Sequence, residues 1–235
     1  MGMDASAYAL AHGVTSTRGA LRSWKTRPGP IVRSWVLGSL LAASLLLVAI
    51  WVIAEVSAPS GSVSLHRPPF GVGDTRDVIR IFTTNLLVLG LHAMACVAGF
   101  IAGDALPVQA RYHAGLRRAV YVQGRRLAIG FVVLATMFSL SLQAYLLGST
   151  VAHVAGGLHG SPAMLLLGLL PHALPELTAL FLPLAAWIIA SRRERWDQLL
   201  AAAIVTVAIA VPVLVFTATW EVYVAPHILS TLFGY

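Results

Sequence analysis

Charged residues are scarce in this sequence. Asp, Glu, Lys and Arg together make up 11% of the 235 residues, whereas an ordinary soluble domain carries about 25%. Hydrophobic residues make up 58% of the chain. Because so few charges cannot cover that much apolar surface in water, the composition excludes an ordinary soluble domain and predicts an integral membrane protein.

Cysteine and the common catalytic motifs are also lacking. Cys96 is the single cysteine and lies in an apolar run, which excludes an intramolecular disulfide and a cysteine-rich metal site. The sequence contains no G-x-S-x-G elbow, no H-E-x-x-H pair and no phosphate-binding P-loop. The connections between apolar stretches reach only about 23 residues, too short to fold alone. The function is therefore expected in the membrane or at its faces.

Five long apolar stretches dominate what is present. Each exceeds the roughly 20 residues that a helix needs to cross the hydrocarbon core. They are residues 34–56, 78–103, 127–151, 162–190 and 199–220. The sequence therefore predicts an all-α fold, a polytopic membrane helix bundle. We expect a cytoplasmic basic arm at residues 1–30, followed by a single transmembrane helical domain at residues 31–235.

The formal charge of +7 arises from 16 Lys and Arg against 9 Asp and Glu, and the cations gather in the connections. Five lie in the N-terminal arm, five in the second connection and three in the fourth; three lie in the first connection, none in the third or the tail. Since cationic connections stay inside, we expect a bacterial cytoplasmic membrane protein with its N-terminus inside and its C-terminus outside. This distribution forms no face for nucleic acid.

The segment "LPHALPEL", residues 170–177, places two prolines inside the fourth apolar stretch. That stretch of 29 residues would run about 43 Å as one helix, against a hydrocarbon core of about 30 Å. Pro171 disfavours helix at the residue before it, and Pro175 suits the first turn of a helix. The sequence therefore predicts a helix broken at Pro171-His172; the alternative is one kinked helix.

One stripe of the second span carries polar and small residues. Asn85, His92 and Cys96 recur at intervals of seven and four, and Gly99 and Gly103 extend the same stripe. Glycines at this spacing allow two helix backbones to approach closely, so Gly99 and Gly103 are predicted at a helix contact.

Polar residues from four spans are predicted at a similar depth, in the outer half of the bilayer. They are Asn85, Gln143, His172, Glu176 and Glu221, with His92 as a further candidate. His172 and Glu176 share a helical face, a spacing that suits a metal, a proton relay or a buried ion pair. A zinc ion would need further ligands from His92, Cys96 or Glu221. Helix packing and interhelical hydrogen bonds are the alternative roles, and neither a catalytic residue nor a cofactor is assigned.

Three segments together resemble the stage II sporulation protein M-like family of integral membrane proteins. They are "FTTNLLVLGLHAMACVAGFIAG", "LPHALPEL" and "WEVYVAP", in the order of the family's asparagine-bearing span, its L-P-H-G-x-x-E-L motif and its closing E-x-[YF]-x-T-P signature. The matching residues are Asn85, Pro171, His172, Glu176, Leu177, Glu221, Tyr223 and Pro226. The resemblance covers residues 80–226. Ala173 and Ala225 depart from it, replacing the family's glycine and threonine.

The resemblance implies a role in membrane complexes. The family's namesake acts with peptidoglycan-degrading proteins during engulfment of the forespore, while relatives occur near AAA-type ATPase genes or accompany the maturation or export of circular bacteriocins. Three functions stay open: a non-enzymatic component of a cell-envelope complex, a transporter or ion-handling protein, and an intramembrane peptide-maturation enzyme. The expected partners are the lipid bilayer and other membrane or envelope proteins, and a homo-oligomer stays open.

The predicted orientation can be tested with single cysteines in a Cys96→Ala background. Ser161→Cys should react with an impermeant thiol reagent in intact cells, because its connection is predicted outside, and Ser23→Cys should react only after lysis. Both variants should react fully in lysed cells, which controls for local access. The reverse pattern in intact cells would contradict the orientation.

Overall fold

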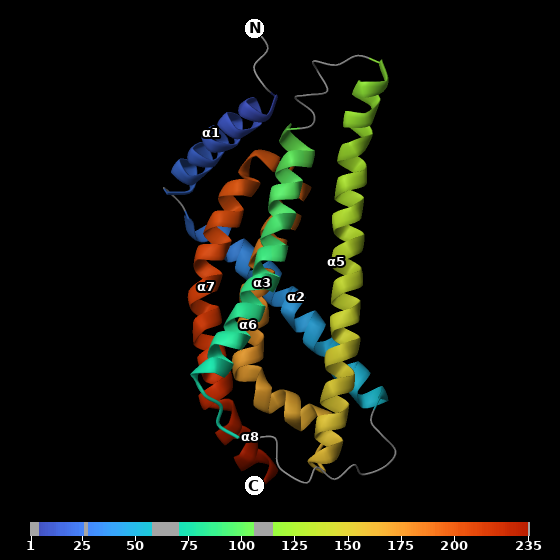
Figure 1. Cartoon of the computed structure of the whole chain (residues 1–235), viewed down its shortest axis with the longest axis vertical. Coiled ribbons are helices and arrows are strands. Elements are labelled where there is room, and N and C mark those ends of the chain that lie inside the picture. Colours follow the sequence, from blue (N-terminus) through green and yellow to red (C-terminus); the bar gives the residue numbers. More distant parts are fainter. Residues whose placement is uncertain (1–4, 26–27, 58–70, 106–114, 235) are drawn as a thin grey trace. The chain divides into compact units, whose positions relative to one another are not determined.

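The computed structural model describes residues 5–25, 28–57, 71–105 and 115–234 (Figure 1), and these residues are helical with short turns and contain no strand. The helices in chain order are α1 (Ala5–Lys25), α2 (Pro28–Val56), α3 (Thr75–Phe100), η1 (Ile101–Ala105), α5 (Gly115–Gly157), α6 (Pro162–Arg192), η2 (Trp196–Gln198), α7 (Leu199–Tyr223) and α8 (Ala225–Phe233). The predicted all-α class is confirmed.

Five helices are long and apolar enough to cross a membrane. They are Pro28–Val56, Thr75–Asp104, Ile129–Gly157, Pro162–Arg192 and Trp196–Tyr223. Each contains most or all of one predicted apolar stretch and extends it by several residues, because the helices continue into the polar flanks. The chain is therefore a multi-pass membrane protein.

The predicted break in the fourth span is absent. α6 runs as one helix from Pro162 to Arg192, through Pro171 and Pro175. Each proline removes only one rung of the backbone hydrogen-bond ladder, and a membrane helix tolerates that loss by bending. Figure 1 draws α6 as one continuous ribbon that bends near its N-terminal end. The 31 residues of α6 form a helix about 46 Å long, which is longer than the hydrocarbon core is thick. The helix bends and does not break, as in the kinked-helix alternative.

The chain divides into two compact units, each built from parts of the same five long helices. Unit 1 comprises Met1–Ser39, Val88–Thr136 and Leu180–Ala210, and unit 2 comprises Leu40–Leu87, Met137–Ala179 and Val211–Tyr235. Unit 1 includes α1, η1 and η2, and unit 2 includes α8.

Helix packing in unit 1 depends on small residues that face tryptophan. A Cβ atom at Gly99 would lie 2.6 Å from Nε1 of Trp187 and 2.7 Å from Leu199, and one at Gly103 would overlap the ring of Trp196. All three of these larger side chains are buried. The two glycines therefore lie at a close helix contact, where a larger side chain has no room.

The N-terminal helix is part of unit 1. α1 and η1 both contact η2, and Ala20 and Trp24 of α1 are buried. The ring of Trp24 meets the ring of Trp35 edge-on, with 5.3 Å between centroids. Nε2 of His12 lies 2.8 Å from Oδ2 of Asp104 in η1. The part of the basic arm that forms α1 is therefore a docked helix.

The close packing at Gly99 of α3 and Gly103 of η1 predicts that glycines of the same span differ in their tolerance of substitution. Gly103→Ala and Gly99→Ala should each lower the free energy of unfolding by about 1–3 kcal/mol, because the added methyl group overpacks a tryptophan contact. Gly90→Ala is the matched control, since a Cβ atom there would meet nothing within 4 Å. Thermal unfolding in detergent measures all three. Equal stability of the three variants would contradict the contact.

Candidate functional site

A hydrogen bond between α3 and α6 lies at the centre of the polar residues in unit 2. Nδ2 of Asn85 donates to Oε1 of Glu176 at 2.9 Å, and both side chains are partly buried. These residues are 91 positions apart, so the bond joins two different spans. Buried amides and carboxylates need such partners because water cannot satisfy them within an apolar bundle.

A second carboxylate and a cation complete this arrangement. Glu221, near the end of α7, lies close enough to Glu176 for their charges to interact, and the charge of Arg80 on α3 acts on Glu221. We call Arg80, Asn85, Glu176 and Glu221 the polar network. Two carboxyl groups near each other in an apolar bundle cost free energy when both are ionised, and the Asn85 amide supplies a hydrogen bond to one of them.

Arg80 is the network member that the sequence reasoning counted only as a loop cation. It lies on α3 one turn before Thr84, and its guanidinium is 3.4 Å from Oδ1 of Asp77, with 74% of its side chain exposed. Helical spacing gave no signal for its role, because a separation of five residues places Arg80 and Asn85 on different faces of α3. Near it, Thr75 Oγ1 and the Tyr223 hydroxyl lie 3.4 Å apart, which links the start of α3 to the end of α7.

His172 lies one turn before Glu176 on α6 and is only 5% exposed. Its Nδ1 is buried and has no hydrogen-bond partner among the described residues. A buried polar atom without a partner costs about 1–3 kcal/mol. His172 is therefore next to the polar network along the helix, but its Nδ1 forms no hydrogen bond with it among the described residues.

The remaining predicted residues have other contacts. Gln143 on α5 donates from Nε2 to Ser139 Oγ of the same helix at 3.1 Å. His92 belongs to unit 1, where its ring meets Phe181 edge-on at 5.5 Å. The Cys96 thiol, also in unit 1, lies 3.2 Å from the Pro183 carbonyl oxygen. The spacing of polar residues along a helix thus predicted which of them share a helix face, but not which residue each side chain contacts.

A metal centre would require several ligands to converge. In residues 5–25, 28–57, 71–105 and 115–234, no group of three or more His, Cys, Asp or Glu side chains is placed to hold a metal ion. What the polar network offers is two carboxylates, one amide and one cation. This set can join helices or hold a proton between carboxylates.

The Asn85–Glu176 bond predicts measurable coupling between α3 and α6. Asn85→Ala and Glu176→Ala should each destabilise the bundle, and the double variant should lose about 1 kcal/mol less than their sum, as for other interhelical hydrogen bonds in membranes. Glu176→Gln should retain most of the stability, because its amide oxygen can still accept the bond. Unfolding in detergent gives the free energies.

Gln143→Ala is the control for this cycle, since its amide bonds within its own helix. Paired with Glu176→Ala, it should give additive losses. Additivity of Asn85→Ala and Glu176→Ala would show that the bond contributes nothing to the bundle.

Comparison with known proteins identifies part of the chain. Residues 119–226 match the family model of Stage II sporulation protein M, a stretch that includes His172, Glu176 and Glu221 but begins after Asn85. No curated protein and no solved structure matches the chain. The resemblance seen in the sequence motifs is thereby confirmed. Residues 119–226 of this multi-pass membrane protein are therefore similar to stage II sporulation protein M.

Proposed function

We propose that this protein is a non-enzymatic component of a cell-envelope complex and holds partner proteins at the membrane. The family match supports this role because the namesake family acts in a membrane complex. The polar network supports it as well, since an interhelical hydrogen bond between Asn85 and Glu176 stabilises a bundle without any chemistry. The partners would be other membrane or envelope proteins, including a second copy of this chain, and not nucleic acid.

The observation that carries the proposal is the exposure of α5. Only 6% of the most apolar part of the span Ile129–Gly157 is buried, against 50% for Pro162–Arg192. This span also lies inside the family match. The C-terminal part of α5 is buried at Val151, Ala152 and Ala155, but its most apolar part has a surface left to contact another transmembrane helix.

A stripe of large side chains marks the α5 face within unit 2. Phe138, Leu142 and Tyr145 recur at helical spacing and are 71%, 45% and 60% exposed. Spacings of four and three residues let side chains of one helix fit between those of another. Tyrosine and phenylalanine are enriched in protein interfaces, and tyrosine is common among residues that contribute most to binding. We therefore assign this stripe, Phe138–Leu142–Tyr145, as the partner contact.

The proposed orientation places the C-terminus of the chain outside a bacterial cytoplasmic membrane. The cation asymmetry supports an internal N-terminus and an external C-terminus. In that orientation the start of α3, the α5–α6 turn and α8 are at the outer ends of their spans. The stripe and the polar network would then serve partners that act outside the cell.

The stripe can be tested by capture of partners in mild detergent, with the eluted proteins identified by mass. Phe138→Ala combined with Tyr145→Ala should reduce the yield of co-purified partner about tenfold, since two aromatic contacts would be lost. Leu41→Ala combined with Val48→Ala on α2 is the matched control, because these residues share the spacing and are 61% and 54% exposed, but lie outside the family match.

The control variant should retain its partner, and both variants should elute and unfold as the unaltered protein does. A yield that both variants retain in full would mean that the α5 stripe faces only lipid. A partner lost equally from both would contradict a specific contact.

A further inference from the structure

A cavity of about 400 Å³ opens in unit 1 where the ends of several helices meet. Its walls come from the end of α1, the start of α2, the end of α6, η2 and α7. The residues that bear on its chemistry are Trp24, Ser34, Trp35, Arg193, Arg195 and Gln198. The polar network, which lies in unit 2, contributes none of them.

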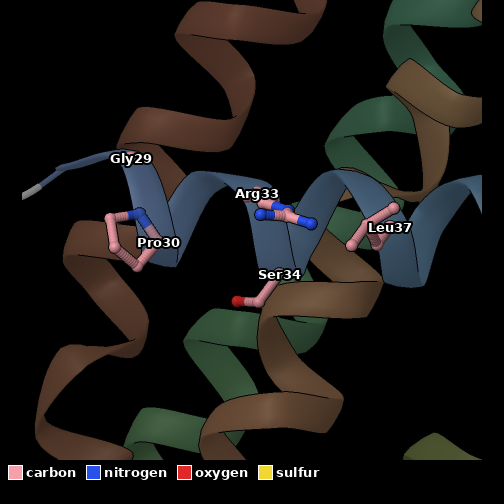
Figure 2. Close-up of a pocket in the computed structure, with 5 residues that line it drawn as sticks. All are labelled: Gly29, Pro30, Arg33, Ser34 and Leu37. Atoms are coloured by element: carbon pink, nitrogen blue, oxygen red, sulfur yellow. The ribbon is translucent and has the colours of Figure 1, made fainter.

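A second hollow, of about 670 Å³, adjoins this cavity at Ser34. Gly29, Pro30, Arg33, Ser34 and Leu37 line it, and Figure 2 shows these five residues along the first turns of α2, with Arg33 and Ser34 in the middle. Ser34 borders both spaces, so they adjoin beside the start of α2. We call the two spaces together the α2 groove.

The α2 groove carries an excess of positive charge. Arg33, Arg193 and Arg195 line it, and Arg195 Nε lies 3.6 Å from Oδ1 of Asp197. Glu194 also stands in the same turn. Within the part of the chain that the structure describes, neither Arg33 nor Arg193 has a salt bridge. Two guanidinium groups are thus available to an anion, and their planar fork matches a phosphate group.

An apolar wall stands beside these cations. Trp24 and Trp35 are 8% and 4% exposed and pack edge-on, and Ala186, Ile189 and Ala190 of α6 continue the surface. Tryptophan is enriched at the membrane interface, where one side of a site is apolar and the other is wet. The groove lies at the ends of α2 and α6, which is the depth of lipid headgroups for spans of this length.

We infer that the α2 groove binds the phosphate headgroup of an anionic membrane lipid. Arg33 and Arg193 bind the phosphate, and the Gln198 amide binds the polar part of the headgroup. The Ser34 hydroxyl donates to the Ile31 carbonyl and accepts a hydrogen bond from the headgroup, and the tryptophan wall contacts the first carbons of the lipid. Basic pockets between transmembrane helices bind anionic lipids by this chemistry. A lipid is favoured over free phosphate because the apolar wall gives a free anion nothing to contact. In the proposed orientation the groove lies in the inner leaflet.

The experiment measures lipid bound to the full chain by native mass spectrometry. The protein is held in detergent micelles that contain either phosphatidylglycerol or phosphatidylcholine. We expect a retained phosphatidylglycerol and little phosphatidylcholine. Arg33→Gln combined with Arg193→Gln should weaken phosphatidylglycerol binding about thirtyfold, because two cations that face the phosphate are removed.

Arg18→Gln combined with Arg22→Gln is the matched control, since these exposed residues of α1 change the net charge equally but do not line the groove. This variant should retain the lipid. Arg33→Lys combined with Arg193→Lys should bind with intermediate strength, because charge is retained and the planar fork is lost. The lysine pair also keeps the test decisive if the glutamine pair does not fold.

Three outcomes would overturn the inference. The glutamine and lysine pairs could bind phosphatidylglycerol as tightly as the unaltered protein, which would place the lipid elsewhere. The control could lose the lipid equally, which would indicate diffuse surface charge. Inorganic phosphate alone, in micelles of phosphatidylcholine, could raise the melting temperature as much as phosphatidylglycerol does, which would identify a site for a soluble anion.

Discussion

The structure depends on one constraint: inside hydrocarbon, every backbone amide and carbonyl group must find its partner within the protein. A helix meets this requirement residue by residue, so the five apolar segments form helices of 25 to 43 residues. The same requirement explains α6. Breaking that helix at Pro171-His172 would release several backbone groups at once, whereas bending through each proline loses only one hydrogen bond. A continuous, bent helix therefore costs less free energy than a broken one.

Packing then depends on how closely the helices approach. Lipid tails are as apolar as leucine, so the hydrophobic effect contributes little between spans, and close backbone contact and interhelical hydrogen bonds matter more. Unit 1 uses the first device, where Gly99 and Gly103 accept tryptophan rings. Unit 2 uses the second, where Asn85 reaches Glu176. The two units are therefore stabilised by different chemistry, although the same five helices pass through both.

The two units also present different charges. Unit 1 combines arginines with tryptophans around the α2 groove and docks α1 through Trp24 and the His12–Asp104 pair. Unit 2 gathers two glutamates with one nearby arginine. Cations and tryptophan suit anionic headgroups, while a carboxylate-rich interior suits helix association or proton exchange. A membrane component can thus have one unit that binds lipid and another that serves partners.

The sequence by itself determined the fold class and the five spans, because hydrophobic length follows directly from composition along the chain. It also indicated the similarity to stage II sporulation protein M that residues 119–226 show, since the proline, histidine and glutamate spacing is local. Tertiary structure decided which residues meet. Asn85 and Glu176 are 91 positions apart, and His12 and Asp104 are 92 apart; no local pattern encodes either pairing. The sequence also did not determine whether the helix is broken or continuous at Pro171. The local preference of proline favours a break, whereas the bilayer favours a continuous helix, and only the folded backbone shows which effect is larger.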